Sequence, residues 1–110
     1  MYFTFNQNNP GGFTVVNDSV CGVVIIEADT ADQANKKAEE IGIYFYGCST
    51  GNDCPCCGDR WDAQYNDAEG TDEPEIYGVP VCEVKRGLFR SQAYIYRLGG
   101  TKEVVNFRDN

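Results

Sequence analysis

Four of the six cysteines lie within ten residues, and this cluster constrains the fold more than any other feature of the chain. The run CPCCG at residues 54–58 contains C-P-x-C-G, the knuckle of zinc ribbons and rubredoxin-like sites. Two residues between the thiolates let both sulfurs bind one metal ion, and the glycine permits the turn that follows. The sequence therefore predicts a structural zinc ion held within Cys48, Cys54, Cys56 and Cys57.

The fourth ligand is open, because Cys56 and Cys57 are neighbours and adjacent residues seldom both reach one ion. The other candidates for this position are Cys82, Cys21, Asp53 and Asp59. The spacing is also compatible with iron. Three explanations compete with a metal: disulfides, a Cys54–Cys57 redox pair, and buried thiols without a ligand, which suit Cys21 and Cys82.

The chain contains no histidine, which excludes Ser-His-Asp and Cys-His catalysis. No recognisable nucleophile, phosphate or dinucleotide motif is present, so we expect a protein that is not an enzyme. At 110 residues and 42% hydrophobic content, one folded domain over residues 1–110 is expected. Apolar runs such as residues 23–26 are too short to span a membrane, and no leader opens the chain. We expect a cytoplasmic protein with no membrane partner.

Charge is distributed unevenly along the chain. The formal net charge is −8, yet six of the nine basic residues follow residue 84. A negative globule repels the phosphate backbone, so generic nucleic-acid binding is not expected. The basic C-terminal strands offer a local site for a small anionic ligand. Its candidate residues are Arg86, Arg90, Arg97 and Lys102, although these charges also suit simple neutralisation of the acidic body.

The acidic residues are most concentrated at positions 66–75, where Gly70 and Pro74 favour an exposed loop. We call this segment the acidic loop. A solvated loop needs no function, but a negative surface also suits a basic groove on a partner protein. Arg60 and Trp61 are predicted to be exposed beside it, with a cover over the metal loop or the core as the other interpretation of Trp61. The predicted partner-binding residues are Arg60, Trp61, Asp67, Glu69, Asp72, Glu73 and Glu75.

Hydrophobic patterns predict one helix and several strands. Residues 30–33 match a capping box, and an apolar stripe continues to Ile41, which predicts a helix over about residues 30–41 with Gly42 as its stop. The segment 21–28 is apolar on both faces, as a central strand would be. Further strands are predicted at 2–5 and 13–16, paired as a hairpin, at 43–46, 60–65 and 77–84, and at 93–98 and 102–107, a second hairpin. Together they predict an α+β domain: a mainly antiparallel sheet, one packed helix and a cysteine-rich metal loop at residues 47–61.

Residues 47–61, with the pattern G-C-x5-C-P-C-C-G-D-R-W, resemble a family of small uncharacterised proteins encoded by tailed bacteriophages. The likeness extends back through residues 24–29 and the predicted helix and forward to residues 76–78, and so covers roughly residues 1–81. The resemblance implies a phage origin, a location in the host-cell cytoplasm and an accessory role. It brings no established activity and no assigned residues.

Two classes of function follow. The first is a non-enzymatic, zinc-stapled phage accessory protein that binds and modulates or inhibits a host protein, such as a component of antiviral defence. The second is a protein that sequesters a small anionic ligand, such as a nucleotide signal, through its basic C-terminal strands. A thiol redox enzyme that uses Cys54 or Cys57 is a weaker third alternative.

Overall fold

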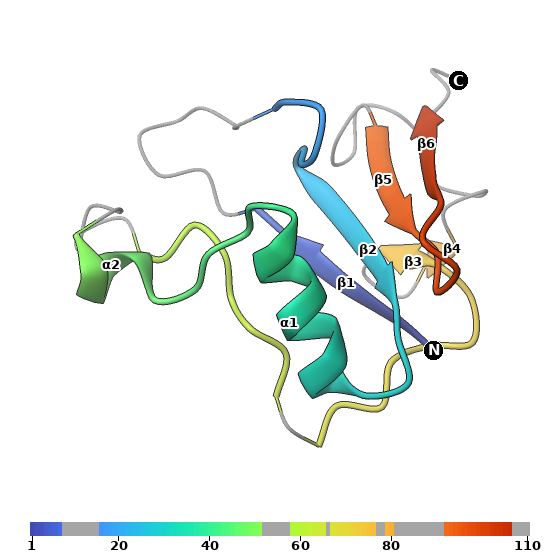
Figure 1. The fold of residues 1–110 in the computed structure, drawn as a ribbon, viewed down its shortest axis with the longest axis horizontal. Helices are drawn as coiled ribbons and strands as arrows, with labels where there is room; N and C mark the ends of the chain where they lie inside the picture. Colours follow the sequence, from blue (N-terminus) through green and yellow to red (C-terminus); the bar gives the residue numbers. More distant parts are fainter. Residues whose placement is uncertain (8–15, 52–57, 66, 77–78, 81–91, 107–110) are drawn as a thin grey trace.

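The computed structural model of the chain describes residues 1–7, 16–51, 58–65, 67–76, 79–80 and 92–106. The elements in order are β1 (Tyr2–Asn6), β2 (Val23–Glu27), α1 (Ala31–Glu40), α2 (Gly47–Thr50), β3 (Glu75–Ile76), β4 (Val79–Pro80), β5 (Gln92–Tyr96) and β6 (Lys102–Asn106). Figure 1 shows α1 lying across one face of the main sheet and α2 at the end of an excursion away from it. The fold is α+β, as predicted.

Four strands form the main sheet in the order β1-β2-β5-β6. The outer pairs, β1 with β2 and β5 with β6, are antiparallel, which confirms the predicted C-terminal hairpin. The central strands β2 and β5 are parallel, with Ile25 opposite Ile95. Two of the three pairings are antiparallel, as expected of a mainly antiparallel sheet, but the parallel central pair makes the sheet mixed. A parallel pair needs a long crossover, which residues 28–91 supply and which no local pattern reveals.

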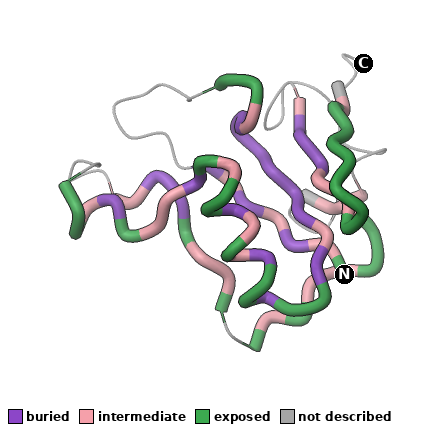
Figure 2. The backbone as a smooth tube through the Cα atoms, viewed as in Figure 1, coloured by how far each residue is buried: buried purple, intermediate pink, exposed green. Residues whose placement is uncertain are grey.

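The main sheet separates two apolar clusters. Because side chains alternate along a strand, Val24 and Ile26 of β2 face α1, whereas Val23 and Ile25 face the other way. All four are buried, which confirms the prediction of a central strand. Figure 2 shows buried residues along β1, β2 and β5 and mostly exposed residues along β6. Strand β6, at one edge of the sheet, thus contributes little to the core.

Local signals fix both ends of α1. The Thr30 hydroxyl accepts a hydrogen bond from the Gln33 N–H at 3.2 Å, and the Gln33 side chain accepts one from the Asp29 N–H. At the other end Gly42 has φ +105°, and the Ile43 N–H donates to the Ala38 carbonyl at 3.0 Å. This arrangement is a Schellman motif, which ends the helix where the sequence predicts. The buried alanines of the helix pack on the sheet.

Two predicted strands are not strands. Residues 43–46 instead place Ile43 in the core and stack Phe45 on Phe5, with ring centroids 6.0 Å apart. Tyr46 then adopts a left-handed conformation, φ +59°, which no strand can continue. Residues 60–65 insert Trp61 into the core and pair their backbone with a helix side chain, described below.

The remaining strand predictions are met only in part. Of the predicted strand at residues 77–84, the structure describes only β4, which pairs antiparallel with β3. Residues 77–78 and 81–84 lie outside the described residues. The predicted partner of β1, residues 13–16, lies outside them except for the exposed Val16. Within the described part of the chain, β1 pairs with β2.

Candidate protein-binding surface

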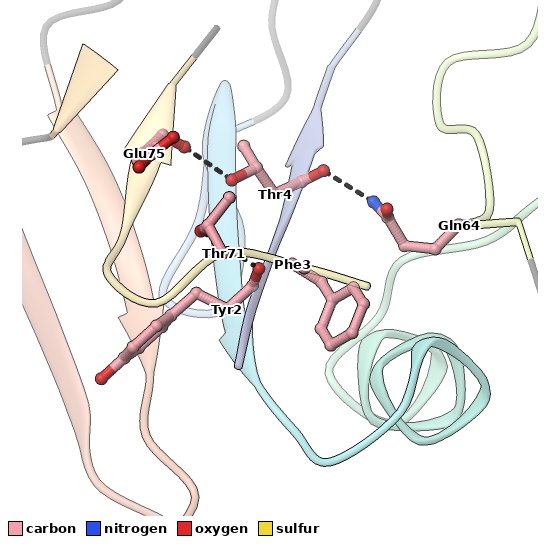
Figure 3. Close-up of a pocket in the computed structure, with 7 residues that line it drawn as sticks. Tyr2, Phe3, Thr4, Gln64, Thr71 and Glu75 are labelled. Atoms are coloured by element: carbon pink, nitrogen blue, oxygen red, sulfur yellow. Dashed lines mark hydrogen bonds between the residues drawn. The ribbon is translucent and has the colours of Figure 1, made fainter. Parts of the chain in front are cut away.

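The acidic loop, described here over residues 67–75, is fixed along the outer edge of β1. Tyr2 and Thr71 exchange two backbone hydrogen bonds, of 2.8 and 2.9 Å, and so form an isolated antiparallel bridge. The Thr4 hydroxyl donates to the Glu75 carbonyl at 2.6 Å, as Figure 3 shows. The Thr71 hydroxyl donates to the Glu73 carbonyl at 2.6 Å. These bonds hold the loop by its backbone and leave its side chains available.

Gln64 joins the sheet edge to the segment that precedes the acidic loop. Its side-chain amide donates to the Thr4 carbonyl at 2.7 Å (Figure 3). Its backbone pairs with Asn35 of α1: the Asn35 amide donates to the Gln64 carbonyl at 3.0 Å, and the Gln64 N–H donates to the Asn35 side-chain oxygen at 2.9 Å. A helix side chain thereby makes the two bonds that a neighbouring strand would make.

A cavity of about 300 Å³ lies between the acidic loop and β1. It is lined by Tyr2, Phe3, Thr4, Gln64, Gly70, Thr71 and Glu75. The hydrogen bonds described above cross this region, so its polar groups serve to hold the loop. We assign the cavity a structural role in positioning the acidic side chains.

The carboxylates of the acidic loop face solvent. Asp67, Glu69, Asp72 and Glu73 are exposed, and Glu75 is partly buried. Among the residues that the structure describes, none forms an ion pair with these five side chains; the pairs present are Lys36 with Asp32 and Arg97 with Glu103. The loop is therefore exposed as predicted, and its backbone is ordered by specific contacts.

A cleft of about 510 Å³ lies next to the acidic loop. We call it the tyrosine cleft; the described residues that line it are Tyr46, Asp62, Ala63, Gln64 and Tyr65. Tyr46 is 66% exposed and Tyr65 is 81% exposed, which is unusual for such large side chains. Sequence reasoning missed these two tyrosines because it assigned both to strands. Gln64 lines this cleft and the cavity under the acidic loop, so the two features adjoin.

The prediction that Arg60 and Trp61 are exposed is wrong. Trp61 is 2% exposed within the cluster that faces α1, where it closes the core. Arg60 is 6% exposed, and its guanidinium donates to the Gln7 side-chain oxygen at 2.7 Å. Gln7 in turn donates to the Cys21 carbonyl at 3.2 Å. Burying the indole removes far more apolar surface from water than leaving it at the rim, so neither residue contributes a contact surface.

Three of the four predicted zinc ligands, Cys54, Cys56 and Cys57, lie outside the described residues, as does Cys82. Cys48 is partly buried in α2, and its N–H donates to the Asp59 carboxylate at 2.9 Å. The described residues alone contain no group of three potential ligands. Cys21 is buried, and its thiol donates to the Val23 carbonyl at 3.1 Å, the environment expected for a buried thiol.

The described basic residues of the C-terminal hairpin are engaged within the chain. Arg97 donates to Glu103 and to the Tyr2 hydroxyl, and its guanidinium lies 5.4 Å from the centre of the Tyr2 ring. Hydrogen bonding to Glu103 raises the pKa of Arg97 above its usual value. Lys102 lies 4.0 Å from the centre of the Tyr94 ring and donates to the Asp18 carbonyl. Arg86 and Arg90, the other candidates for anion binding, lie outside the described residues.

Comparison with known proteins identifies a family. The chain matches, over residues 1–110, the family described as domain of unknown function (DUF7296). It belongs to that family. No curated protein and no solved structure matches this DUF7296 chain. In the parts of the chain that the structure describes, no helix is long and apolar enough to cross a membrane.

Proposed function

We propose that the chain is a non-enzymatic binding protein that attaches to a basic surface of a partner protein through its acidic loop. One observation carries the proposal: the loop backbone is hydrogen-bonded to β1, whereas its carboxylates project to solvent without an ion pair to any described residue. A surface that is already ordered loses little conformational entropy on binding. Clustered charges of one sign also steer a partner of the opposite sign.

The adjoining tyrosine cleft supports a protein as the partner. Tyrosine is enriched among the side chains that dominate binding energy at protein interfaces. Here two exposed tyrosines stand beside a charged rim, an arrangement that resembles an interface with an anchor and a polar border. A net charge of −8 makes a basic protein a better partner than a nucleic acid.

The resemblance of residues 47–61 to tailed-phage proteins supports a cellular location and a kind of partner for this function. We propose an accessory protein of the host-cell cytoplasm whose partner is a host protein, such as a component of antiviral defence. A zinc ion held within Cys48, Cys54, Cys56 and Cys57 would staple the excursion that bears Tyr46, because a structural metal contributes folding energy to a loop of this kind. Arg97 contacts Glu103 and the Tyr2 ring, and Lys102 contacts the Tyr94 ring. These contacts within the chain do not support the alternative of an anion-sequestering protein.

The experiment compares two variants that each convert two exposed glutamates to glutamines. The first is Glu69→Gln with Glu73→Gln on the acidic loop, and the second is Glu39→Gln with Glu40→Gln at the end of α1. A partner is captured from a bacterial host lysate with the unaltered chain and purified. Its Kd is then measured by calorimetry for all three proteins at low and physiological salt.

We expect the acidic-loop variant to bind about tenfold more weakly at low salt, because two rim charges at roughly 0.5–1 kcal/mol each are removed. The α1 variant should bind within about twofold of the unaltered chain, which shows that net charge alone is not the cause. Equal weakening by both variants, or no weakening by either, refutes the acidic loop as the docking surface.

A further inference from the structure

The tyrosine cleft has the chemistry of a receptor for a cation. Tyr46 and Tyr65 contribute aromatic rings, and Asp62 contributes an exposed carboxylate. Ala63 and Gln64 are the other described residues of the lining, so no basic residue is present among the described residues of the cleft. The Asp62 carboxylate forms no hydrogen bond or ion pair with another residue that the structure describes.

Two aromatic rings and one carboxylate favour one kind of guest. The face of an aromatic ring carries partial negative charge and attracts a cation, more strongly when water is excluded. An anion would meet the Asp62 charge, and an apolar group would remove water from that carboxylate without replacing its hydrogen bonds. A planar guanidinium satisfies both features, because it stacks on an aromatic ring and donates to a carboxylate through its edge.

The backbone holds the cleft in a defined shape. Tyr46 has φ +59° and ψ +39°, a conformation that a non-glycine residue adopts at a cost of about 1 kcal/mol. Its carbonyl accepts hydrogen bonds from the Ser49 and Thr50 N–H groups, at 3.0 and 3.1 Å. On the other side the Ala68 N–H donates to the Tyr65 carbonyl at 3.0 Å, which joins this tyrosine to the acidic loop. Both tyrosines are thus fixed by their main chains while their rings remain exposed.

We propose that the tyrosine cleft receives an arginine side chain of the partner protein, with the guanidinium against Tyr46 and Tyr65 and hydrogen-bonded to Asp62. This inference rests on the proposed function and names the residue that the partner contributes. The acidic loop next to the cleft attracts the basic surface around that arginine, and the cleft selects one side chain from it. We choose arginine as the occupant because its positive charge complements the Asp62 carboxylate and the two aromatic rings.

The test uses the full chain, isotopically labelled, and two small probes. N-acetyl-arginine-amide is the cationic probe, and N-acetyl-citrulline-amide is its neutral counterpart of nearly the same shape. Aromatic and backbone NMR signals are followed as each probe is added at millimolar concentrations. We expect saturable shifts at Tyr46, Tyr65 and Asp62 with the arginine probe, and shifts at least about fivefold smaller with the citrulline probe, which lacks the charge.

Three variants and one control complete the test. Tyr46→Asn removes a ring while keeping a residue type that tolerates the left-handed conformation, Tyr65→Ser removes the other ring, and Asp62→Asn removes the charge. Each should abolish saturation by the arginine probe. The control Leu98→Ser, at an exposed position on the β5–β6 turn, should leave the shifts unchanged. Because the substituted side chains are exposed, unchanged backbone spectra away from the cleft will show that the fold is intact.

The probe experiment and the partner experiment can fail separately. Shifts confined to the acidic loop, or equal shifts with the citrulline probe, overturn the cleft as an arginine receptor even when the partner binds through the acidic loop. Saturable arginine binding at the cleft together with a partner that is insensitive to Glu69→Gln and Glu73→Gln upholds the cleft and refutes the proposed function. A partner whose affinity falls about tenfold or more both with Tyr65→Ser and with the acidic-loop variant supports both.

Discussion

Gly70 is the residue on which the position of the acidic loop depends most directly. Its φ is +73°, in the region that favours glycine. A Cβ atom at this position would lie 2.9 Å from the Tyr2 carbonyl oxygen and 3.0 Å from the end of the Phe3 ring. The loop can approach β1 closely enough to form the Tyr2–Thr71 bridge only because no side chain intervenes.

Replacing Gly70 by alanine tests this dependence. We expect Gly70→Ala to lower the free energy of unfolding by about 1–3 kcal/mol, through backbone strain and the clash with Tyr2. The matched control is Gly99→Ala, where a Cβ atom meets nothing within 4 Å. Urea unfolding of both variants provides the measurement. A Gly70→Ala protein as stable as Gly99→Ala would show that the loop does not depend on this close approach.

Sequence reasoning was least accurate at single residues whose burial is set by distant partners. Arg60 and Trp61 follow the cysteine motif, and this position suggested exposure, yet the core on the α1 face takes in the indole and Gln7 receives the guanidinium. Nothing between residues 54 and 65 indicates that Gln7 is near. Tyr46 and Tyr65 were overlooked because both were assigned to strands, and local pattern does not show that their side chains are exposed.

Among the elements, α1 has a second role as a support for the acidic loop. Asn35 lies on the helix one turn after the cap and makes both hydrogen bonds with the Gln64 backbone, while Gln64 bonds to Thr4 of β1. Helix, loop and sheet edge are thereby connected through one glutamine. This connection also protects the edge of β1, whose outward carbonyl at Thr4 would otherwise be available to another strand.

The Asn35→Ala variant removes this connection. We expect it to lower the free energy of unfolding by about 1–2 kcal/mol and to speed amide hydrogen exchange at Gln64, because two hydrogen bonds with a partly buried backbone are lost. Lys36→Ala on the same helix is the control, since its ion pair with Asp32 is exposed and contributes little. Exchange at Gln64 that is the same in both variants would contradict the role of Asn35.

Elements with local signals were predicted well, and elements with distant partners were not. The capping box and Gly42 specify α1 within its own sequence, and the alternation-free run at 23–27 marks a strand buried on both faces. The strand pairing of β2 with β5 depends on residues far apart in the chain. The short segments at 43–46 and 60–65 were assigned as strands from local pattern, but they do not join the sheet and instead pack as irregular chain.

At the scale of the whole molecule, we predict that a bound zinc ion contributes to stability. We expect native mass spectrometry to find one zinc ion per chain, released by acid. Cys48→Ser should lose the ion and lower the Tm by about 10 °C or more, because structural zinc contributes several kcal/mol of folding energy. Cys21→Ser should retain it, since that thiol is buried beside Val23. A metal-free native mass would refute the zinc prediction, and loss of zinc in Cys82→Ser would identify the fourth ligand.

The parallel pairing of β2 with β5 also sets the order in which the molecule can be assembled. The β5–β6 hairpin is local and can form early, whereas the centre of the sheet can close only after residues 28–91 have been brought round. The acidic loop and the tyrosine cleft both lie in that intervening chain. The acidic loop and Gln64 of the cleft are held by β1 and α1, so both features depend on long-range folding and cannot form from the β5–β6 hairpin alone.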